Sequence, residues 1–233
     1  MAADRVTDKQ IVERIAAEAQ LTAQADETST RFPYVIQYNR TDWAFLLERA
    51  RNIRFEVFVD DKTLVFRKGQ EDQGRVLVLA YGKGLKSFQP VIDTQKQVSR
   101  VVVRGYDPRT KKDVVAQAGS GDEDTTMGGK SSGSQVAEQA FSGKVEEVRV
   151  DHPVASQEEA DQLARAYYNV VLQDLVRGSG SAVGDPSLRA GRVIELRGLG
   201  KLYSGEYYLV QVTHSIGSGG YVTSFNVRRP SLT

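Results

Sequence analysis

The sequence predicts an α+β fold in which a small helix and hairpin domain precedes a larger antiparallel β-barrel domain carrying one long helix. Two amphipathic helices and a β-hairpin follow one another before residue 68. Beyond residue 75, runs rich in β-branched residues alternate with glycine-containing turns. A single long stretch, over 157–178, has apolar residues at helical spacing and separates these strands into two groups. We therefore place the two domains at 6–68 and 75–233.

The small domain begins with a helix whose start is marked by a capping box. The Thr7 hydroxyl and the Gln10 amide are spaced to satisfy free backbone N–H groups, and apolar residues then recur at helical spacing up to Ala19. A second helix is predicted over 41–51, with Thr41 as its N-cap. Alternating apolar residues on either side of the acidic turn at 60–62 predict a β-hairpin.

The larger domain contains one segment that breaks the pattern. Residues 118–134 hold five glycines and almost no apolar side chain, so we expect a flexible loop that projects outward and is expendable. A second capping box, from Ser156 to Glu159, opens the long helix, which is expected to end at Gly178. Short strands with tight turns predict a barrel or sandwich. The expected strands are 76–81, 98–104, 144–150, 192–197, 206–213 and 221–228.

The composition limits the classes of function. The 233 residues carry a net charge of +1, which lacks the wide basic field typical of non-specific nucleic-acid binding. The absence of cysteine excludes disulfides and thiolate chemistry, and two histidines leave little for a histidine-rich metal site. No stretch approaches the roughly 20 apolar residues of a membrane helix, and no secretion signal is visible. We therefore expect no cofactor, no metal, no nucleic-acid partner and no membrane span, with synthesis in the cytoplasm.

Two catalytic letter patterns fall inside the glycine-rich segment. Gly129-Lys130-Ser131 matches the last letters of the phosphate-binding loop motif, but the full motif requires glycine where Asp124 stands. No strand before it and no helix after it is predicted. The stretch up to Gly133 also matches the G-x-S-x-G letters of a hydrolase elbow, which strains its serine on a sharp turn. A flexible loop would not hold a serine in a strained conformation, so we interpret both matches as chance.

The remaining candidate groups are interpreted as structural, and no catalytic residue is predicted. Asp122-Glu123-Asp124 lacks the alternating ligands of a calcium loop. His152 and His214 lie in different elements, so each is expected to be a structural or surface imidazole. A carboxylate pair for glycosidic chemistry stays open, because separation in space decides that case. A locally basic stretch, interrupted by Asp107 and Asp113, is a poor nucleic-acid platform and is expected to be solvated or to face a protein. It comprises Arg100, Arg104, Arg109, Lys111 and Lys112.

Three stretches are informative as a group: Tyr38 to Ala50, Val103 to Pro108, and the tail from Gly191 to Arg229. In this order they resemble the late control protein D family of tailed phages. These are baseplate hub proteins related to the hub portion of valine-glycine repeat G proteins and to the hubs of contractile injection systems. The resemblance covers most of the chain apart from 118–134.

The resemblance implies a homotrimeric hub with no catalysis at the tip of a tail tube. Two similar β-barrels per chain would make a six-fold-like ring, so that a hexameric tube sits on a trimeric spike. Family members usually begin with a barrel ahead of the helix at Thr7, and this sequence lacks it, as a truncated, split or shortened hub would. The resemblance therefore leads us to expect the spike as a separate protein, since the sequence after Arg229 does not resemble one. The implied partners are a tail tube protein above and a separate spike protein below, within a phage tail particle.

Two functions of other classes compete with the hub. A cell-wall hydrolase carried by the tail would need a carboxylate with a raised pKa in a cleft. A carbohydrate- or receptor-binding module could use the tyrosine-rich strands around Tyr203, Tyr207 and Tyr208.

Overall fold

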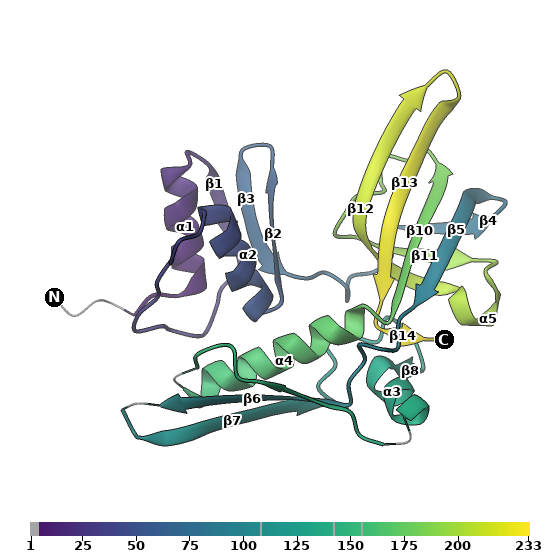
Figure 1. Cartoon of the computed structure of the whole chain (residues 1–233). Coiled ribbons are helices and arrows are strands. Elements are labelled where there is room, and N and C mark those ends of the chain that lie inside the picture. Colours follow the sequence, from purple (N-terminus) through teal and green to yellow (C-terminus); the bar gives the residue numbers. More distant parts are fainter. Residues whose placement is uncertain (1–4, 108, 142, 155) are drawn as a thin grey trace. The chain divides into compact units, whose positions relative to one another are not determined.

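The computed structural model describes residues 5–107, 109–141, 143–154 and 156–233. They form the predicted α+β fold, with a closed six-stranded barrel and two three-stranded sheets (Figure 1). Two compact units interleave along the chain. The division into domains at 6–68 and 75–233 stays a prediction. Unit 1 comprises Met1–Gly69, Val103–Ala116 and Val150–Tyr167, and unit 2 comprises Gln70–Val102, Gln117–Arg149 and Tyr168–Thr233.

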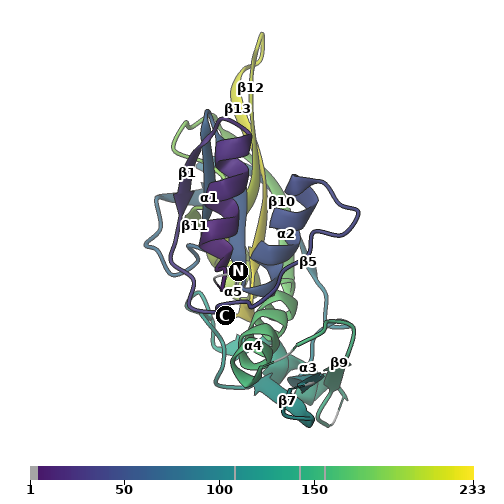
Figure 2. The same cartoon turned by 90° about the vertical axis from the view of Figure 1, so that its left-hand side faces the viewer.

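Unit 1 contains a three-stranded sheet covered by two helices. Helices α1 and α2 lie on the same side of the sheet and face the viewer in Figure 2. Their apolar stripes, including Val12 and Leu46, pack on Leu64 and Phe66 of the central strand. Strand β1 pairs parallel to β3, and β2 pairs antiparallel to it. The elements are α1 (Asp8–Glu18), β1 (Thr22–Ala25), α2 (Asp42–Asn52), β2 (Phe55–Asp60) and β3 (Thr63–Lys68).

The predicted helix starts are confirmed. Both halves of the capping box at Thr7 are formed, because its hydroxyl accepts from the Gln10 N–H and the Gln10 amide oxygen accepts from the Thr7 N–H. Thr41 caps α2 through the N–H of Ala44 at 3.2 Å. The hairpin is also confirmed, and its turn places Asp61 at a φ of 51°, a conformation that aspartate tolerates.

The barrel lies in unit 2 and has the strand order β10-β13-β12-β11-β4-β5. Four of its pairings are antiparallel, as predicted, whereas β4 pairs parallel to both β11 and β5. Its core is apolar, with Leu175, Leu196, Tyr207 and Phe225 almost fully buried. The barrel strands are β4 (Leu77–Tyr81), β5 (Gly84–Ile92), β10 (Val176–Val183), β11 (Val193–Arg197), β12 (Gly205–Gly217) and β13 (Gly220–Arg229).

The remaining elements include residues of both units. A second sheet has the order β7-β6-β9, and α4 begins where the Ser156 hydroxyl accepts from the N–H of Glu159. No helix in the described part of the chain has the length and apolar character needed to cross a membrane. The elements are β6 (Arg100–Asp107), β7 (Lys112–Gly119), β8 (Ser131–Ser132), α3 (Gly133–Phe141), β9 (Glu146–Arg149), α4 (Gln157–Gln173), α5 (Gly200–Tyr203) and β14 (Ser231–Leu232).

The predicted end of the long helix at Gly178 is wrong. Helix α4 ends at Gln173, and Gly178 belongs to barrel strand β10. The glycine is there because its inward side faces a ring: a Cβ on Gly178 would lie 2.5 Å from the Phe88 ring. A Cβ on Gly180 would likewise lie 2.8 Å from the Phe225 ring. These glycines leave room for core aromatics, a role that local sequence does not reveal.

The expectation that residues 118–134 project outward is also wrong. Met127 is only 4% exposed and packs on Val193 and Tyr208 of the barrel. The amide of Asn169 holds the segment twice, accepting from the Asp124 N–H at 2.8 Å and donating to the Asp122 carbonyl at 2.9 Å. Strand β8 then pairs with β14 near the end of the chain. The segment is therefore packed through polar contacts, which its composition did not suggest.

Unit 1 contains a half-buried histidine whose titration affects stability. Burial lowers the pKa of His152, whose Nε2 lies 3.4 Å from the Asn52 amide nitrogen. The folded state therefore resists the proton that the unfolded chain accepts near pH 6.5. The charged groups acting on this imidazole are Glu159 and Asp151, which raise its pKa, and Arg49 and Arg40, which lower it.

We expect the free energy of unfolding to fall as the pH drops below about 6.5 toward the lowered pKa of His152. Stability from the neutral imidazole is fully present above pH 6.5 and is lost on acidification. His152→Gln should flatten this part of the pH profile, measured by urea unfolding at pH 8, 6.5 and 5.5. An equal slope in the variant and the parent chain would contradict the assignment.

Candidate functional site

The phosphate-loop letters do not form a phosphate cradle. A helix, α3, does follow them, which the sequence analysis did not predict, but the backbone N–H groups are already used within the chain. The N–H of Gly129 donates to Thr126, that of Lys130 to Leu232, and that of Gly133 to Pro230. A phosphate-binding loop needs these backbone N–H groups free to bind the anion.

The acidic cluster is also occupied by internal hydrogen bonds. The Glu123 carboxylate accepts from the Tyr168 hydroxyl at 3.0 Å and from the Gly121 N–H at 2.6 Å. The Asp122 carboxylate accepts from the Gly119 N–H at 3.0 Å. Within the described residues, no group of three His, Asp or Glu side chains is placed to hold a metal ion. These carboxylates shape the segment that was expected to be a free loop.

The two histidines belong to different units and are held by separate partners. His152 lies beside Asn52 in unit 1. In unit 2, Nε2 of His214 lies 3.0 Å from the Leu188 carbonyl oxygen, while its Nδ1 lies 2.9 Å from the Tyr221 hydroxyl. The imidazole of His214 thus links the β12–β13 hairpin to the segment that leaves β10.

The tyrosines proposed for glycan binding do not form an exposed platform. Tyr207 and Tyr208 are 0% and 2% exposed, and the Tyr207 hydroxyl donates to the Tyr203 carbonyl at 2.8 Å. Burial raises the pKa of Tyr207 to about 12. The tyrosine basis of the carbohydrate-binding alternative is therefore wrong.

The hydrolase alternative fares no better among the described residues. Burial raises the pKa of the Asp8 carboxyl group. Asp8 is 1% exposed and its Oδ1 accepts from the Arg49 guanidinium at 2.5 Å. A buried carboxylate held by an arginine does not meet the requirement for an accessible acid in a cleft.

In the basic stretch, Arg100 pairs with Glu146 and contacts Gln117.

An uncharged patch lies on the outer face of four neighbouring strands, β5, β10, β13 and β12, next to Arg177 and Arg228. Strand register aligns its side chains in two rows, which we call the polar rows. Seven of the eight side chains are exposed and Ser181 is half-buried. They line a shallow depression of about 340 Å³. The first row is Gln89, Ser179, Asn226 and Gln211, and the second is Ser87, Ser181, Ser224 and Thr213.

Within each polar row, one direct hydrogen bond joins side chains of neighbouring strands. The Ser87 and Ser181 hydroxyl oxygens lie 2.7 Å apart. The Asn226 amide nitrogen donates to the Gln211 amide oxygen at 3.0 Å. Because hydroxyls and amides both donate and accept, such a surface contacts other uncharged polar surfaces without leaving a charge unpaired. We expect it to suit protein contact better than binding of a charged ligand.

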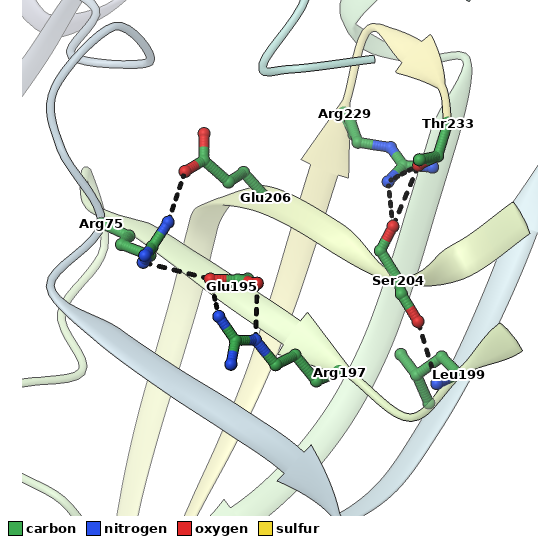
Figure 3. Close-up of polar contacts among 8 residues, drawn as sticks. All are labelled: Arg75, Glu195, Arg197, Leu199, Ser204, Glu206, Arg229 and Thr233. Carbon is green, nitrogen blue, oxygen red and sulfur yellow. Dashed lines mark hydrogen bonds and ion pairs between the residues drawn. The ribbon is translucent and has the colours of Figure 1, made fainter. Parts of the chain in front are cut away.

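A second polar cluster, drawn in Figure 3, lies elsewhere on the barrel and is strongly charged. Glu195 of β11 receives two bonds from Arg197, at 2.6 and 3.1 Å, and is 3.1 Å from Arg75. The Arg197 hydrogen bond lowers the pKa of the Glu195 carboxyl. Arg75 also lies 3.6 Å from Glu206. This network ties the segment just before β4 to β11 and β12.

The same view shows a buried arginine that supports the short helix α5. Arg229 is 1% exposed, and its guanidinium donates to the carbonyls of Leu202 and Ser204 and to the Thr233 hydroxyl. Its charge also lies 4.7 Å from the centre of the Tyr207 ring. A cation near the last carbonyls of a helix is favourable, so Arg229 acts as a structural cap.

Sequence analysis did not predict the polar rows, because their alignment depends on the register between strands. Alternation in 221–228 places Val222, Ser224 and Asn226 on one face, and this was readable from sequence. Their alignment with β10 and β5 follows from pairings between residues far apart in the chain. Strands β5 and β10 were themselves not predicted.

A family model described as the Alg8 N-terminal domain matches residues 4–218. The chain belongs to this family. The match spans both units, so the Alg8 N-terminal domain family covers unit 1 and most of the barrel. No curated protein sequence matches the chain.

Solved structures with a similar fold include two phage tail proteins. The 43 kDa tail protein of prophage MuSo2 from Shewanella oneidensis is 12% identical with a TM-score of 0.72, and the similarity covers 99% of this chain and 67% of that protein. A tail protein from Neisseria meningitidis MC58 is 11% identical, with a TM-score of 0.65 over 98% of this chain and 68% of that one.

A further similar structure comes from a secretion system. The E. coli c3393 protein, described as a type VI secretion component similar to T4 tail proteins gp27 and gp5, is 14% identical with a TM-score of 0.57. The similarity covers 98% of this chain and 50% of that protein. At these identities the comparisons establish the fold, and they confirm the predicted α+β architecture with its barrel.

Proposed function

We propose that this chain is a structural hub component of a phage tail or phage-like contractile injection particle. The observation that carries the proposal is the similarity of 99% of the chain to a prophage tail protein at a TM-score of 0.72. The type VI component with similarity to gp27 and gp5 supports the same role in a related machine. The ordered stretches that resemble late control protein D point to a baseplate hub in particular.

In this proposal the chain works as a homotrimer that joins the tail tube above to a separate spike protein below, within the tail particle. The trimer would match the symmetry of the tail tube to that of the spike, because identical surfaces repeated around its axis present matched contacts to both partners. The uncharged polar rows on the barrel support a role in protein contact. Catalysis is not part of the proposed role, since the candidate motifs in the described residues are used for internal hydrogen bonds.

Light scattering after size-exclusion chromatography tests the assembly. We expect about three times 25.7 kDa, near 77 kDa. A second measurement asks where the chain resides: immunogold labelling of a tagged chain should mark one end of purified tail particles. A matched untagged preparation controls for antibody background. Absence from the particles would overturn the proposal, and clearing of peptidoglycan by the purified chain would overturn its non-catalytic part.

A further inference from the structure

Unit 1 contains a groove that the proposed function does not use. It is a depression of about 350 Å³, within the range of roughly 300–1,000 Å³ typical of small-molecule sites. A void of about 10 Å³, enough for about one water molecule, adjoins it. The two share five lining residues, Phe32, Arg49, Asn52, His152 and Glu159, of which the first three are buried. The groove therefore has an inner end formed by buried side chains.

Three large apolar side chains line the outer part of this groove, and all three are strongly exposed. Tyr34 is 75% exposed, Ile36 is 57% exposed and Tyr38 is 81% exposed. They come from one short segment between Phe32 and helix α2. Exposed apolar residues scattered singly are ordinary, whereas a group of them beside a hollow marks a binding surface. The rings of Tyr34 and Tyr38 offer flat apolar faces to a ligand.

The segment that carries the tyrosines is held by hydrogen bonds at both of its ends. At one end, Phe32 and Val6 exchange two backbone hydrogen bonds, of 2.9 and 3.0 Å. At the other end, the Gln37 amide donates to the Arg40 carbonyl at 3.0 Å and to the Asp42 carboxylate at 2.8 Å. The tyrosines therefore extend from a fixed backbone, which reduces the entropy lost when a ligand binds.

The inner end of the groove offers hydrogen-bond donors and acceptors without a net charge. Asn52 is only 9% exposed, and its amide nitrogen lies 3.4 Å from Nε2 of His152. Burial lowers the pKa of His152, so its imidazole is neutral at pH 7 and has one donor and one acceptor nitrogen. The Asn52 amide likewise both donates and accepts. Groups of this kind match hydroxyls, which also do both.

The charged side chains around the groove balance one another. Two arginines and two glutamates line it: Arg40, Arg49, Glu48 and Glu159. Arg40 pairs with Glu48, and Arg49 pairs with Asp8. Both arginines among the described lining residues therefore already have acidic partners, and an anionic ligand would have to compete with them. This balance of charge favours an uncharged ligand.

We propose that this groove binds an uncharged oligosaccharide. A sugar ring has a face of C–H groups and an edge of hydroxyls, so it needs both an aromatic surface and neutral polar groups. In the complex, sugar rings stack on Tyr34 and Tyr38, and hydroxyls exchange hydrogen bonds with Asn52 and His152. A proline-rich peptide also stacks on tyrosines, but it lacks most N–H donors and would leave acceptors at the inner end unpaired.

Isothermal titration calorimetry of the whole chain tests the proposal with two neutral probes, a tetramer of N-acetylglucosamine and maltohexaose. We expect saturable binding of at least one probe, with a dissociation constant of about 1 mM or below. Tyr34→Ala and Tyr38→Ala should each weaken this binding about tenfold, because each removes a stacking surface. Tyr81→Ala is the matched control, since Tyr81 is 60% exposed but lies on barrel strand β4.

Nuclear magnetic resonance gives a second readout that does not depend on any variant. Adding the bound sugar to the parent chain should shift the backbone amide signals of residues 34–38 and leave those of the β12–β13 hairpin unchanged. Shifts confined to the barrel would place the sugar elsewhere and overturn the assignment of the groove.

Four further results would overturn the inference. These are the absence of binding by either sugar, equal weakening by Tyr81→Ala, binding of a proline-rich decapeptide in place of the sugars, and a change in solution mass caused by Tyr34→Ala. The last would show that the tyrosines contact a second copy of the chain. The groove lies within unit 1 of one chain, so the inference does not depend on the proposed trimer. A particle-bound trimer that binds no sugar would leave the proposed function standing.

Discussion

Asp8→Ala is expected to lower the free energy of unfolding by about 3–5 kcal/mol, the largest single effect in unit 1. Asp8 is 1% exposed and Arg49 is 9% exposed, and Nε of Arg49 lies 2.5 Å from Oδ1 of Asp8. The guanidinium also lies 4.1 Å from the centre of the Phe32 ring. Removing the carboxylate leaves a buried cation without its counter-charge, which is more costly than the pair itself.

A double-mutant cycle separates this cost from lost packing. The variants are Asp8→Leu, Arg49→Met and the two together, measured by urea unfolding at pH 7. Each single variant should be strongly destabilised, while the double variant should recover much of the loss because no uncompensated charge is buried. If the two single losses add without any recovery, the ion pair does not couple α1 to α2 energetically.

Gly180→Val is expected to destabilise the barrel by about 1–3 kcal/mol or more. A Cβ on Gly180 would lie 2.8 Å from the Phe225 ring and 2.8 Å from the Ser87 carbonyl oxygen. Because one of these atoms is backbone, moving a side chain does not relieve the contact. The strain would act on the pairing of β10 with β5 as well as on the core.

The neighbouring position supplies a matched control. Ser179→Val adds the same side chain to the same strand, but Ser179 points outward and is exposed. We expect its effect on stability to stay within about 0.5 kcal/mol. Chemical unfolding followed by tyrosine and tryptophan fluorescence measures both variants. Similar losses in the two would contradict the assignment of Gly180 to the core side of β10.

The elements that sequence analysis identified have their causes within a few residues. Thr7 and Thr41 cap helices through N–H groups three positions away, and alternation along 55–66 is enough to specify a hairpin. The absence of cysteine likewise needs no structure. Such interactions are local, so the chain order alone specifies them.

The wrong predictions concern residues whose environment comes from distant segments. The stretch around Gly178 looks like a helix end, yet its glycines face Phe88 and Phe225 on the two neighbouring strands β5 and β13. Pro90 interrupts the sequence pattern of β5, although an edge strand tolerates it. The segment 118–134 looks unstructured because its packing depends on Asn169 and β14.

By itself, the sequence determined the α+β class, the helix starts and the hairpin of this protein, because these follow from hydrogen bonds and periodicity over short spans. Only the tertiary structure decided that β10 is a strand, that 118–134 is packed, and that Ser, Thr, Asn and Gln side chains align as polar rows. Those features require strand register between residues separated by tens of positions, and register is set by the packing of the whole barrel.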